Sequence, residues 1–460
     1  MRFSNNLLIL AAKHGTTFAH YYFFMKLLLT RCIFITFLLL TFTTDSAKAQ
    51  FLMDMVDTTK EMGKGILSIY QKYDHLRISG YMQPQYQVAQ SEGAKSYEGG
   101  DFPPNVDNRF MLRRGRIRFD YMHFSDNTKP SVQFAFQFDG TERGVAIRDF
   151  WGRVFENNVK LFALTTGMFA RPFGYEVNLS SGDRESPERG RMSQILMKTE
   201  RDLGAMVSLE PRDRKNRLKY IKWDAGFFNG QGLANPVDYD SYKDFISKVN
   251  LKPYPISNSL YLSAGVSYLY GGFMQGNKYL YTMEDKGGQY QFVVDSSEEN
   301  IGSKLPRIYY GTDAQLKWVH PKKAVTEFRA EYWWGTQTAS GSASETPPNL
   351  LTTGQYYIRN FNGAFFYLLH AFDKHNQVVL KYDWYDPNTK VSGNEIGADN
   401  GTLAPDIKFN TFGVGYIYYV NENLKLVAWY AVVKNEITAL EGYTSDLEDN
   451  ILTLRLQFKF

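Results

Sequence analysis

The amino-acid sequence predicts an all-β protein, a transmembrane antiparallel β-barrel of about sixteen strands that follows a short N-terminal periplasmic helix. Three observations predict this fold. From Leu76 onward, apolar and polar residues alternate with a period of two in one segment after another. Short and long polar gaps alternate between these segments, and the last segment closes the chain with Phe460. Strands that face lipid on one side and water on the other have these features.

The start of the chain predicts a secretory signal peptide. An apolar run covers residues 27–29 and 33–40, with Lys26 and Arg31 on its N-terminal side, and the small residues Ala47 and Ala49 follow it as a cleavage site. The alternative is a transmembrane anchor, but the run is too short for that and its cleavage site is too good.

Residues 1–24 resemble an upstream extension, because a start at Met25 gives the signal a normal charged end. Cleavage after Ala49 leaves a mature chain that begins at Gln50 and has no cysteine, since the one Cys32 lies in the signal. Neither a disulfide nor a thiol nucleophile is then available. The removed part holds five of the 52 basic and one of the 48 acidic residues, which leaves 47 of each. Net charge therefore gives no indication of a nucleic-acid partner.

Residues 50–73 form a separate segment. Apolar residues such as Leu52 and Val56 recur there at helical spacing, which predicts a short amphipathic helix in the periplasm. A plug or a trimer contact is the alternative. The predicted organisation is residues 1–49 as extension and signal, 50–73 as the periplasmic segment, and 74–460 as the barrel.

The strands are predicted from the alternation. In the first, Ile78 and Met82 share the lipid face while Arg77 and Gln83 share the lumen face. The predicted strands are 76–88, 110–123, 131–139, 145–155, 159–169, 201–210, 218–228, 242–252, 259–270, 307–318, 324–334, 355–368, 376–386, 408–419, 423–434 and 450–460. An open edge would leave backbone groups unpaired in lipid, so we expect the sheet to close.

The gaps predict the same fold independently. Gaps such as 125–129 are short and gaps such as 170–200 and 387–407 are long, as in barrels with short periplasmic turns and long outer loops. The third gap, 140–144, is a short exception. Two alternating runs inside the gap 271–306 form either a hairpin or two more barrel strands, so eighteen strands is the alternative count.

The last segment is the strongest single signal for a barrel. Leu456, Phe458 and Phe460 share one face, while Arg455 and Gln457 share the other. This end is similar to those of outer-membrane proteins, which implies that Phe458 and Phe460 are read by the barrel-assembly machinery.

No motif of a known enzyme class is present. The sequence lacks G-x-S-x-G, a Walker loop, H-E-x-x-H and paired cysteines, and its seven histidines are scattered. A serine–histidine pair could still meet in the folded protein, but no residue pattern favours one. We expect neither an enzyme nor a bound cofactor or metal.

The second predicted strand carries five arginines within residues 109–118. Strand parity places Ile117 on the lipid face and Arg114, Arg116 and Arg118 on the lumen face. The energetic cost agrees, because a guanidinium that faces hydrocarbon costs about 2–4 kcal/mol. Three forked cations along one wall predict a ladder for anions. The alternative is an ordinary charged wall whose arginines pair with acids on neighbouring strands.

A wider count of lumen residues gives a mild cationic bias of nine against six. The basic ones are Arg77, Arg114, Arg116, Arg118, Lys317, Arg329, Lys381, Arg455 and Lys459, and the acidic ones are Asp120, Asp139, Asp313, Glu327, Glu331 and Asp383.

The gap 170–200 is the second candidate site. If it folds into the barrel, it would narrow the lumen and place Arg184, Arg189 and Arg191 at a constriction. The acidic residues Asp183, Glu185 and Glu188 lie beside them in the sequence. A mixed-charge surface loop is the alternative.

Several short motifs occur in an order that is similar to one family. They are the arginine strand 109–118, Pro172-Phe173-Gly174-x-Glu176, Glu188-Arg189, Arg201-Asp202-Leu203-Gly204 and Phe228-Asn229-Gly230-x-Gly232. With these, residues 75–460 resemble the phosphate-selective porin O and P family. The resemblance implies a trimeric, sixteen-stranded porin whose lumen arginines, here Arg114, Arg116 and Arg118, guide phosphate or polyphosphate.

The sequence therefore predicts a porin of the bacterial outer membrane, a water-filled channel for passive diffusion of small hydrophilic solutes with a lean toward anions or phosphate. The alternative is a barrel without a channel, an adhesin or scaffold that acts through its long outer loops. Expected partners are outer-membrane lipid, the barrel-assembly machinery, further copies in a homotrimer, and small anions.

Overall fold

The computed structural model describes residues 75–460 except 127–128, 214, 235–236, 322–323 and 398–399. The predicted signal peptide, the cleavage after Ala49 and the helix within 50–73 lie outside the described residues. Among the residues described, no helix combines the length and the apolar character needed to cross a membrane.

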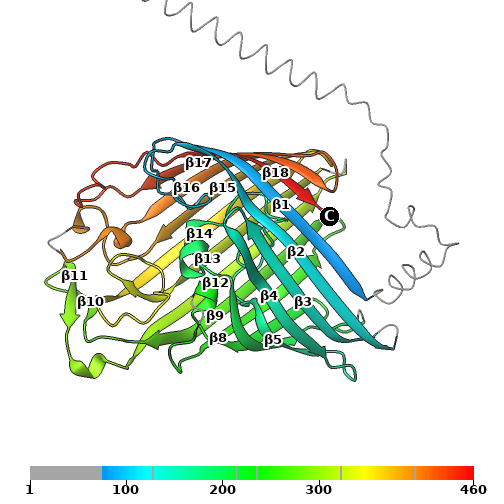
Figure 1. Ribbon diagram of the computed structural model, residues 1–460. Helices are drawn as coiled ribbons and strands as arrows, with labels where there is room; N and C mark the ends of the chain where they lie inside the picture. Colours follow the sequence, from blue (N-terminus) through cyan, green and yellow to red (C-terminus); the bar gives the residue numbers. More distant parts are fainter. Residues whose placement is uncertain (1–74, 127–128, 214, 235–236, 322–323, 398–399) are drawn as a thin grey trace, which may run out of the picture. The chain divides into compact units, whose positions relative to one another are not determined.

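The chain forms one sheet of eighteen strands, sixteen of which close into an antiparallel barrel (Figure 1). Strand β1 pairs with both β2 and β18, which closes the ring. The strands are β1 Leu76–Ala89, β2 Asn108–Asp126, β3 Lys129–Thr141, β4 Gly144–Phe155, β5 Phe162–Ala170, β6 Arg201–Leu209, β7 Ile221–Phe228, β8 Asp244–Pro255, β9 Leu260–Met274, β10 Leu280–Asp285, β11 Tyr290–Asp295, β12 Lys304–Val319, β13 Val325–Ser340, β14 Tyr356–Ala371, β15 Asn376–Asp386, β16 Phe409–Tyr419, β17 Leu424–Asn435 and β18 Ile451–Lys459. The helices are α3 Arg191–Leu196, η2 Gly232–Ala234, η3 Glu298–Asn300, η4 Gly393–Glu395 and η6 Ala404–Asp406.

The predicted barrel of sixteen strands is confirmed, and the two runs inside 271–306 form the hairpin β10–β11. In the barrel wall β9 pairs directly with β12, so the hairpin strands β10 and β11 are not part of the closed ring. The hairpin instead touches β14 through two parallel pairs, which join Leu280 to Tyr356 and Tyr281 to Tyr357. The predicted rhythm of short turns at one end and long loops at the other is also present, and the end with the long loops is called the loop side below.

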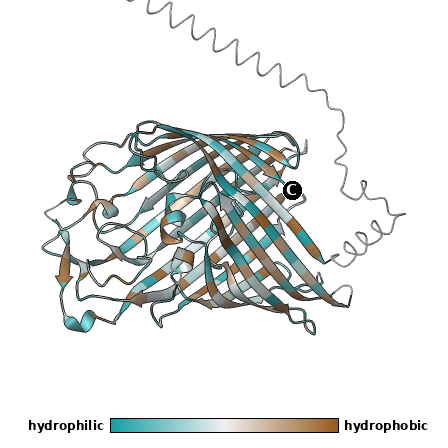
Figure 2. Ribbon diagram, in the orientation of Figure 1, coloured by the Kyte–Doolittle hydropathy of each residue, from teal (hydrophilic) through white to brown (hydrophobic). Residues whose placement is uncertain are grey.

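Hydrophilic and hydrophobic residues alternate along the strands (Figure 2). The exposure of their side chains separates an apolar outer face from a polar lumen. In β18, Leu454 and Leu456 are 46% and 38% exposed on the outside, while Arg455 and Gln457 are 4% and 3% exposed inside. An outer surface of exposed large apolar side chains fits hydrocarbon, not water. The barrel is therefore that of an outer-membrane protein.

The largest difference between predicted and observed strand ends is at β13, which continues to Ser340 beyond the predicted end at 334. Strand β5 starts at Phe162 and not at residue 159. The carboxylate of Glu156 accepts hydrogen bonds from the backbone N–H groups of Asn158 and Val159, and Lys160 has a positive φ of 57°. These contacts hold the segment in a turn, because a non-glycine residue with positive φ cannot continue a strand.

The seam between the two ends of the barrel depends on Gly80. The backbone N–H of Gly80 donates to the carbonyl of Phe460, and the N–H of Phe460 donates to the carbonyl of Gly80. A Cβ on Gly80 would lie 2.5 Å from the carbonyl oxygen of Arg116 and 2.6 Å from the ring of Phe460. The missing side chain thus lets the last aromatic ring cover the junction of β1, β2 and β18.

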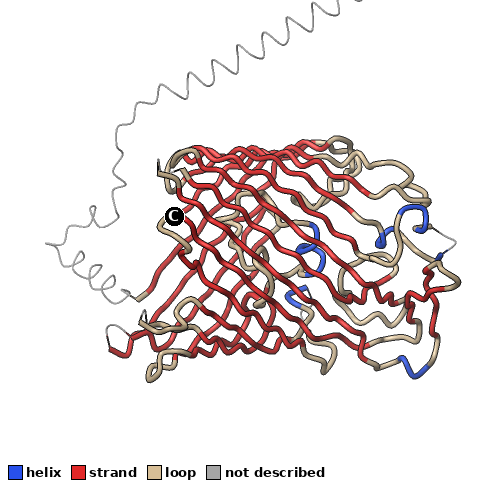
Figure 3. Tube along the Cα trace, turned by 180° about the vertical axis from the view of Figure 1, so that it is seen from behind, coloured by secondary structure: helices blue, strands red, loops and turns tan. Residues whose placement is uncertain are grey.

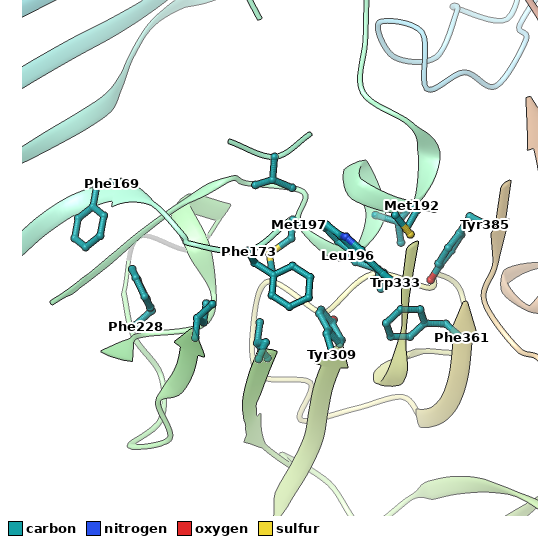
Figure 4. Packing of buried hydrophobic residues seen from close by; sticks show 14 of the residues in the cluster. Phe169, Phe173, Met192, Leu196, Met197, Phe228, Tyr309, Trp333, Phe361 and Tyr385 are labelled. Atoms are coloured by element: carbon teal, nitrogen blue, oxygen red, sulfur yellow. The ribbon is translucent and has the colours of Figure 1, made fainter. Parts of the chain in front are cut away.

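Residues 171–200, here called the inward loop, lie inside the ring of strands and include α3 (Figures 1 and 3). Figure 4 shows how the loop packs on the wall, with Phe173 against Trp333 and Tyr309 and with Met192 in the same cluster. The rings of Phe173 and Trp333 meet edge-on at a centroid distance of 4.7 Å. The main apolar core of the protein is therefore the contact between this loop and the barrel.

Candidate functional site

The inward loop enters the lumen through a turn that only glycine allows. Gly174 has a φ of 65°, and a Cβ there would clash with the carboxylate of Glu331 and the ring of Trp333. That carboxylate accepts hydrogen bonds from the backbone N–H groups of Tyr175 at 2.8 Å and Glu176 at 2.9 Å. The Pro-Phe-Gly-x-Glu motif thus directs the chain inward.

Glu176 then fixes the two halves of the inward loop to each other. Its carboxylate accepts hydrogen bonds from the backbone N–H of Gly190 at 2.9 Å and from the Ser193 hydroxyl at 2.6 Å. Lys381 of β15 lies 3.5 Å away. Burial alone would raise the pKa of Glu176, but Lys381 and these hydrogen bonds hold it below its usual value. The carboxylate therefore stays ionised and keeps the loop compact.

Glu188 ties the same loop to both sides of the barrel seam. Its carboxylate lies 2.9 Å from Arg113 and 2.5 Å from Arg114 of β2, and 3.0 Å from Arg455 of β18. Burial works to raise its pKa, yet the three guanidiniums hold the pKa well below its usual value. A single carboxylate thus neutralises part of an arginine cluster.

Further ion pairs fix the tip of the loop to other strands. Glu185 receives a fork of hydrogen bonds from Arg329 of β13 at 2.8 and 3.0 Å. Asp183 pairs with Lys459 of β18 at 2.9 Å. These contacts, with those of Glu176 and Glu188, hold the loop across the lumen and not against one wall.

Two β-bulges bring more charge into the lumen than strand parity predicts. The pairing of β2 with β1 shifts between Gly115 and Leu112, so Arg113 and Arg114 both face inward. The pairing of β4 with β3 shifts between Ile147 and Asp149, so Arg148 and Asp149 both face inward. A bulge places two residues opposite one and lets neighbours share a face.

The inward charges form a continuous series, the ion-pair chain, which runs Arg116–Asp139–Arg148–Glu200–Arg201–Asp149–Arg118. Successive nitrogen–oxygen distances along it are 2.8, 4.0, 2.9, 3.7, 3.0 and 3.4 Å. Burial would raise the pKa of Glu200, whereas Arg189, Arg148 and Arg201 hold it well below its usual value. The carboxylate of Glu200 therefore stays ionised at neutral pH.

Two cavities lie on opposite sides of the inward loop. The loop-side chamber has a volume of about 920 Å³, and its lining includes Arg116, Asp139, Arg148 and Glu200. The turn-side chamber has a volume of about 420 Å³, and its lining includes Arg118, Asp149 and Arg201. The ion-pair chain thus connects the two chambers along the wall of β2, β3 and β4.

Cations outnumber carboxylates in both linings. The loop-side chamber has nine Lys or Arg residues against six Asp or Glu residues, and the turn-side chamber has five against two. Most of these cations have a carboxylate within 4.0 Å. In the described part of the chain, the exceptions that line a chamber are Arg191 on the loop side and Arg153 on the turn side.

The predicted ladder residues Arg114, Arg116 and Arg118 all point into the lumen, and each is paired with an acid. Arg116 binds Asp139 at 2.8 Å, and Arg118 binds Asp120 at 2.7 Å. The wall of paired charges, given above as the alternative, therefore describes how these arginines are held.

The other predicted pore residues fall into two groups. Arg329, Lys381 and Arg455 are buried contacts of the inward loop. Arg77 and Lys317 share lumen faces but are exposed near the turn side, away from the loop.

The predicted loop arginines are not equivalent. Arg184 is buried within the loop, donates to the backbone carbonyl of Leu179 and lines neither chamber. Arg189 lies 3.5 Å from Glu200 and lines the loop-side chamber. Arg191 lines the same chamber between the rings of Tyr97 and Phe409.

Sequence reasoning missed Arg113, Arg148, Asp149, Glu200 and Arg153. Arg113 and Arg148 depend on bulges, which a single strand does not reveal, whereas Asp149 has the same parity as Trp151. Arg153 follows the inward parity of Trp151 within a predicted strand, so parity could have found it. In the residues that the structure describes, no group of three or more His, Cys, Asp or Glu side chains could hold a metal ion.

An apolar outside, a polar lumen and a loop folded into it define the class of the fold, an outer-membrane barrel of the porin type. No protein-family model and no curated protein sequence matches the chain. Among solved structures, it resembles OprB of Pseudomonas putida, with a TM-score of 0.55 at 11% identity over 87% of this chain and 98% of that one.

Two other solved structures are similar at lower scores. The outer-membrane channel DcaP of Acinetobacter baumannii has a TM-score of 0.49 at 14% identity, over 84% of this chain and 97% of that one. An anion-selective porin from Comamonas acidovorans has a TM-score of 0.48 at 10% identity, over 84% and 99%. At such identities the likeness concerns the fold alone.

Proposed function

We propose that the protein is a porin, a water-filled channel for passive diffusion of small hydrophilic solutes, with a preference for anions. The observation that carries this proposal is the pair of polar chambers on either side of the inward loop, joined along one wall by the ion-pair chain. A solute that follows this wall exchanges its hydration shell for fixed charges and hydrogen-bonding groups.

The preference for anions is inferred from local charge, since the mature chain as predicted has no net charge. Both chambers have three more cations than carboxylates in their linings. Fixed charges act over about 8–10 Å at ordinary salt concentrations, so only the residues around the narrow part determine which ion passes. Phosphate is one candidate solute, because guanidinium groups bind oxyanions through forked hydrogen bonds.

We also expect a homotrimer, packed through apolar outer faces of some strands and inserted by the barrel-assembly machinery. The exposed apolar side chains of the outer face supply surface for both lipid and neighbouring copies. Chemical cross-linking in mild detergent should give a trimer, and a result with monomer alone would exclude this assembly.

The test of the proposed channel is a recording in planar bilayers under a salt gradient. Purified protein should produce stepwise conductance, and its reversal potential should indicate that chloride passes more readily than potassium. Conductance without anion preference would leave a general porin. The absence of any conductance from folded protein would instead favour an adhesin or scaffold that acts through its long loops.

A further inference from the structure

The turn-side chamber contains one arginine that forms no ion pair within the described residues. Arg153 of β4 donates through Nε to the Thr165 hydroxyl at 2.7 Å, which leaves both terminal amino groups of its guanidinium for another partner. In the described residues it has no carboxylate within 4.0 Å, whereas Arg118, Arg201, Lys222 and Lys248 of the same lining each have one.

The acids that line this chamber are already occupied. Asp149 is 2% exposed and lies between Arg118 and Arg201, at 3.4 and 3.0 Å. Asp224 is 5% exposed, accepts a hydrogen bond from Ser208 at 2.6 Å and lies 3.1 Å from Lys222. Neither is free to neutralise Arg153, so the chamber keeps a site for one external negative charge.

The lining of the chamber also contains aromatic and apolar side chains. The Trp151 ring lies between Arg153, whose guanidinium carbon is 5.4 Å from the ring centroid, and Arg118 at 5.7 Å. Phe169 and Met206 also line the chamber. A phosphate dianion is best held by several donors and cations at once. A single guanidinium with two free amino groups, beside apolar side chains, suits a ligand that has one carboxylate and an apolar group.

We propose that the turn-side chamber is a binding site for small organic carboxylates, in which Arg153 binds the carboxylate and Trp151 contacts the apolar body. This proposal rests on the proposed channel function, because the inward loop covers the chamber from the loop side. The volume of the turn-side chamber, about 420 Å³, lies within the range of about 300–1,000 Å³ that is usual for small-molecule pockets.

Arg191, the other chamber cation without a carboxylate within 4.0 Å, is less suited to this role. Its guanidinium carbon lies 3.7 Å from the ring centroid of Phe409 and 4.6 Å from that of Tyr97, so aromatic rings already cover it. The free donor groups of Arg153 face the turn-side chamber, where a solute arrives after it has passed the ion-pair chain.

The experiment measures how strongly three probes block the potassium chloride current: benzoate, acetate and inorganic phosphate. Wild-type channels should be blocked by benzoate at lower concentrations than by acetate or phosphate. Arg153→Gln should raise the half-blocking concentration of benzoate about tenfold or more, the usual effect of losing a charge-assisted hydrogen bond. The half-blocking concentration of Arg153→Lys should lie between those of the wild type and Arg153→Gln, because lysine keeps the charge but lacks the planar, forked donor groups.

Two further variants separate the charge from the apolar contact. Arg217→Gln removes the same charge from an exposed turn outside the chamber and should leave the block unchanged. Trp151→Leu should reduce the advantage of benzoate over acetate. Stronger block by phosphate than by benzoate, or an unchanged benzoate block in Arg153→Gln, would overturn the proposal.

Titration calorimetry of the protein in detergent distinguishes failure of this site from failure of the channel. Benzoate binding that Arg153→Gln abolishes would support the site even if bilayers showed no current. Conductance without measurable benzoate binding would leave the channel standing and remove the site. Gel migration before and after boiling verifies that each variant is folded.

Discussion

Arg148 and Asp149 are consecutive in β4, yet both side chains point into the lumen and pair with different partners. Arg148 lies 2.9 Å from Glu200 and Asp149 lies 3.0 Å from Arg201. The bulge in β4 is responsible, since regular alternation would direct one of the two to lipid.

This relationship predicts opposite effects from neighbouring substitutions. Arg148→Gln should move the reversal potential toward cation preference, and Asp149→Asn should move it toward anion preference, because each removes one fixed charge from the ion-pair chain. Recordings in a salt gradient measure both. If either variant behaves like the wild type, that side chain does not face the ion pathway.

The arginines Arg114, Arg116 and Arg118 give a second prediction. Changing all three to Gln removes three lumen cations and leaves their carboxylate partners in place, so the reversal potential should shift toward cations and any phosphate block should weaken. The matched control changes Lys215, Arg217 and Lys219 to Gln, which removes three charges from an exposed turn. An equal shift in the control would mean that the position of the charges is irrelevant.

Glu188 predicts a change in the width of the pore. Glu188→Gln leaves the guanidiniums of Arg113 and of the buried Arg114 and Arg455 without their shared carboxylate, and breaking a buried ion pair costs about 3–5 kcal/mol. We expect the inward loop to loosen from the wall, so that single-channel conductance rises and anion preference increases. Glu422→Gln, at an exposed turn, is the control. Unchanged conductance would show that other contacts suffice to hold the loop.

A pH dependence is expected for residues 90–107, the loop between β1 and β2. Burial raises the pKa of Glu98 to about 7, with Lys381 opposing the shift and Glu188 and Asp383 adding to it. The docked loop thus favours the protonated carboxyl over the ionised one. Docking should be strongest below about pH 4.5, weaken as the pH rises toward 7, and stay constant above that.

A spin label tests this pH dependence, because the predicted mature chain has no cysteine of its own. A label on Glu92→Cys, at an exposed position of the same loop, should become more mobile as the pH rises through that range. Adding Glu98→Gln should remove the dependence. A mobility that still changes in the double variant would assign the effect to another group.

The seam predicts an assembly defect. Gly80→Ala should push the added methyl group against the Arg116 carbonyl and the Phe460 ring, and loss of Phe460 should uncover the same junction. Both variants should lower the amount of heat-modifiable barrel in the outer membrane. Gly354→Ala, where a Cβ would meet no atom within 4 Å, controls for the methyl group although its positive φ adds some strain. Normal outer-membrane levels of protein lacking Phe460 would contradict its role as an assembly signal.

The strands were predictable because apolar and polar residues alternate within each one. This period of two shows which side chains face lipid without knowledge of the neighbouring strands. The bulges at Arg113 and Arg148 were not predictable, because a bulge is defined by the register with a partner strand. The sequence of residues 171–200 contains an indication that this segment folds inward. Phe173 and Met192 interrupt a polar gap and are buried against the wall. The pairing of charges across the lumen could not be predicted from the sequence, because it depends on which strands face each other in the closed barrel. The same holds for the lack of an ion-pair partner of Arg153 among the described residues.

The contacts of Glu188 have a consequence for the order of assembly. Its partners Arg114 and Arg455 belong to β2 and β18, which come together only when β1 bridges them. In an open sheet Arg114 and Arg455 are not held next to each other, so Glu188 lacks its shared binding site. The carboxylate of Glu188 must remain hydrated until the ring closes, because unpaired charges are costly to bury. Docking of the Glu188 end of the loop is therefore a late event, and it ties completion of the interior to closure of the outer wall.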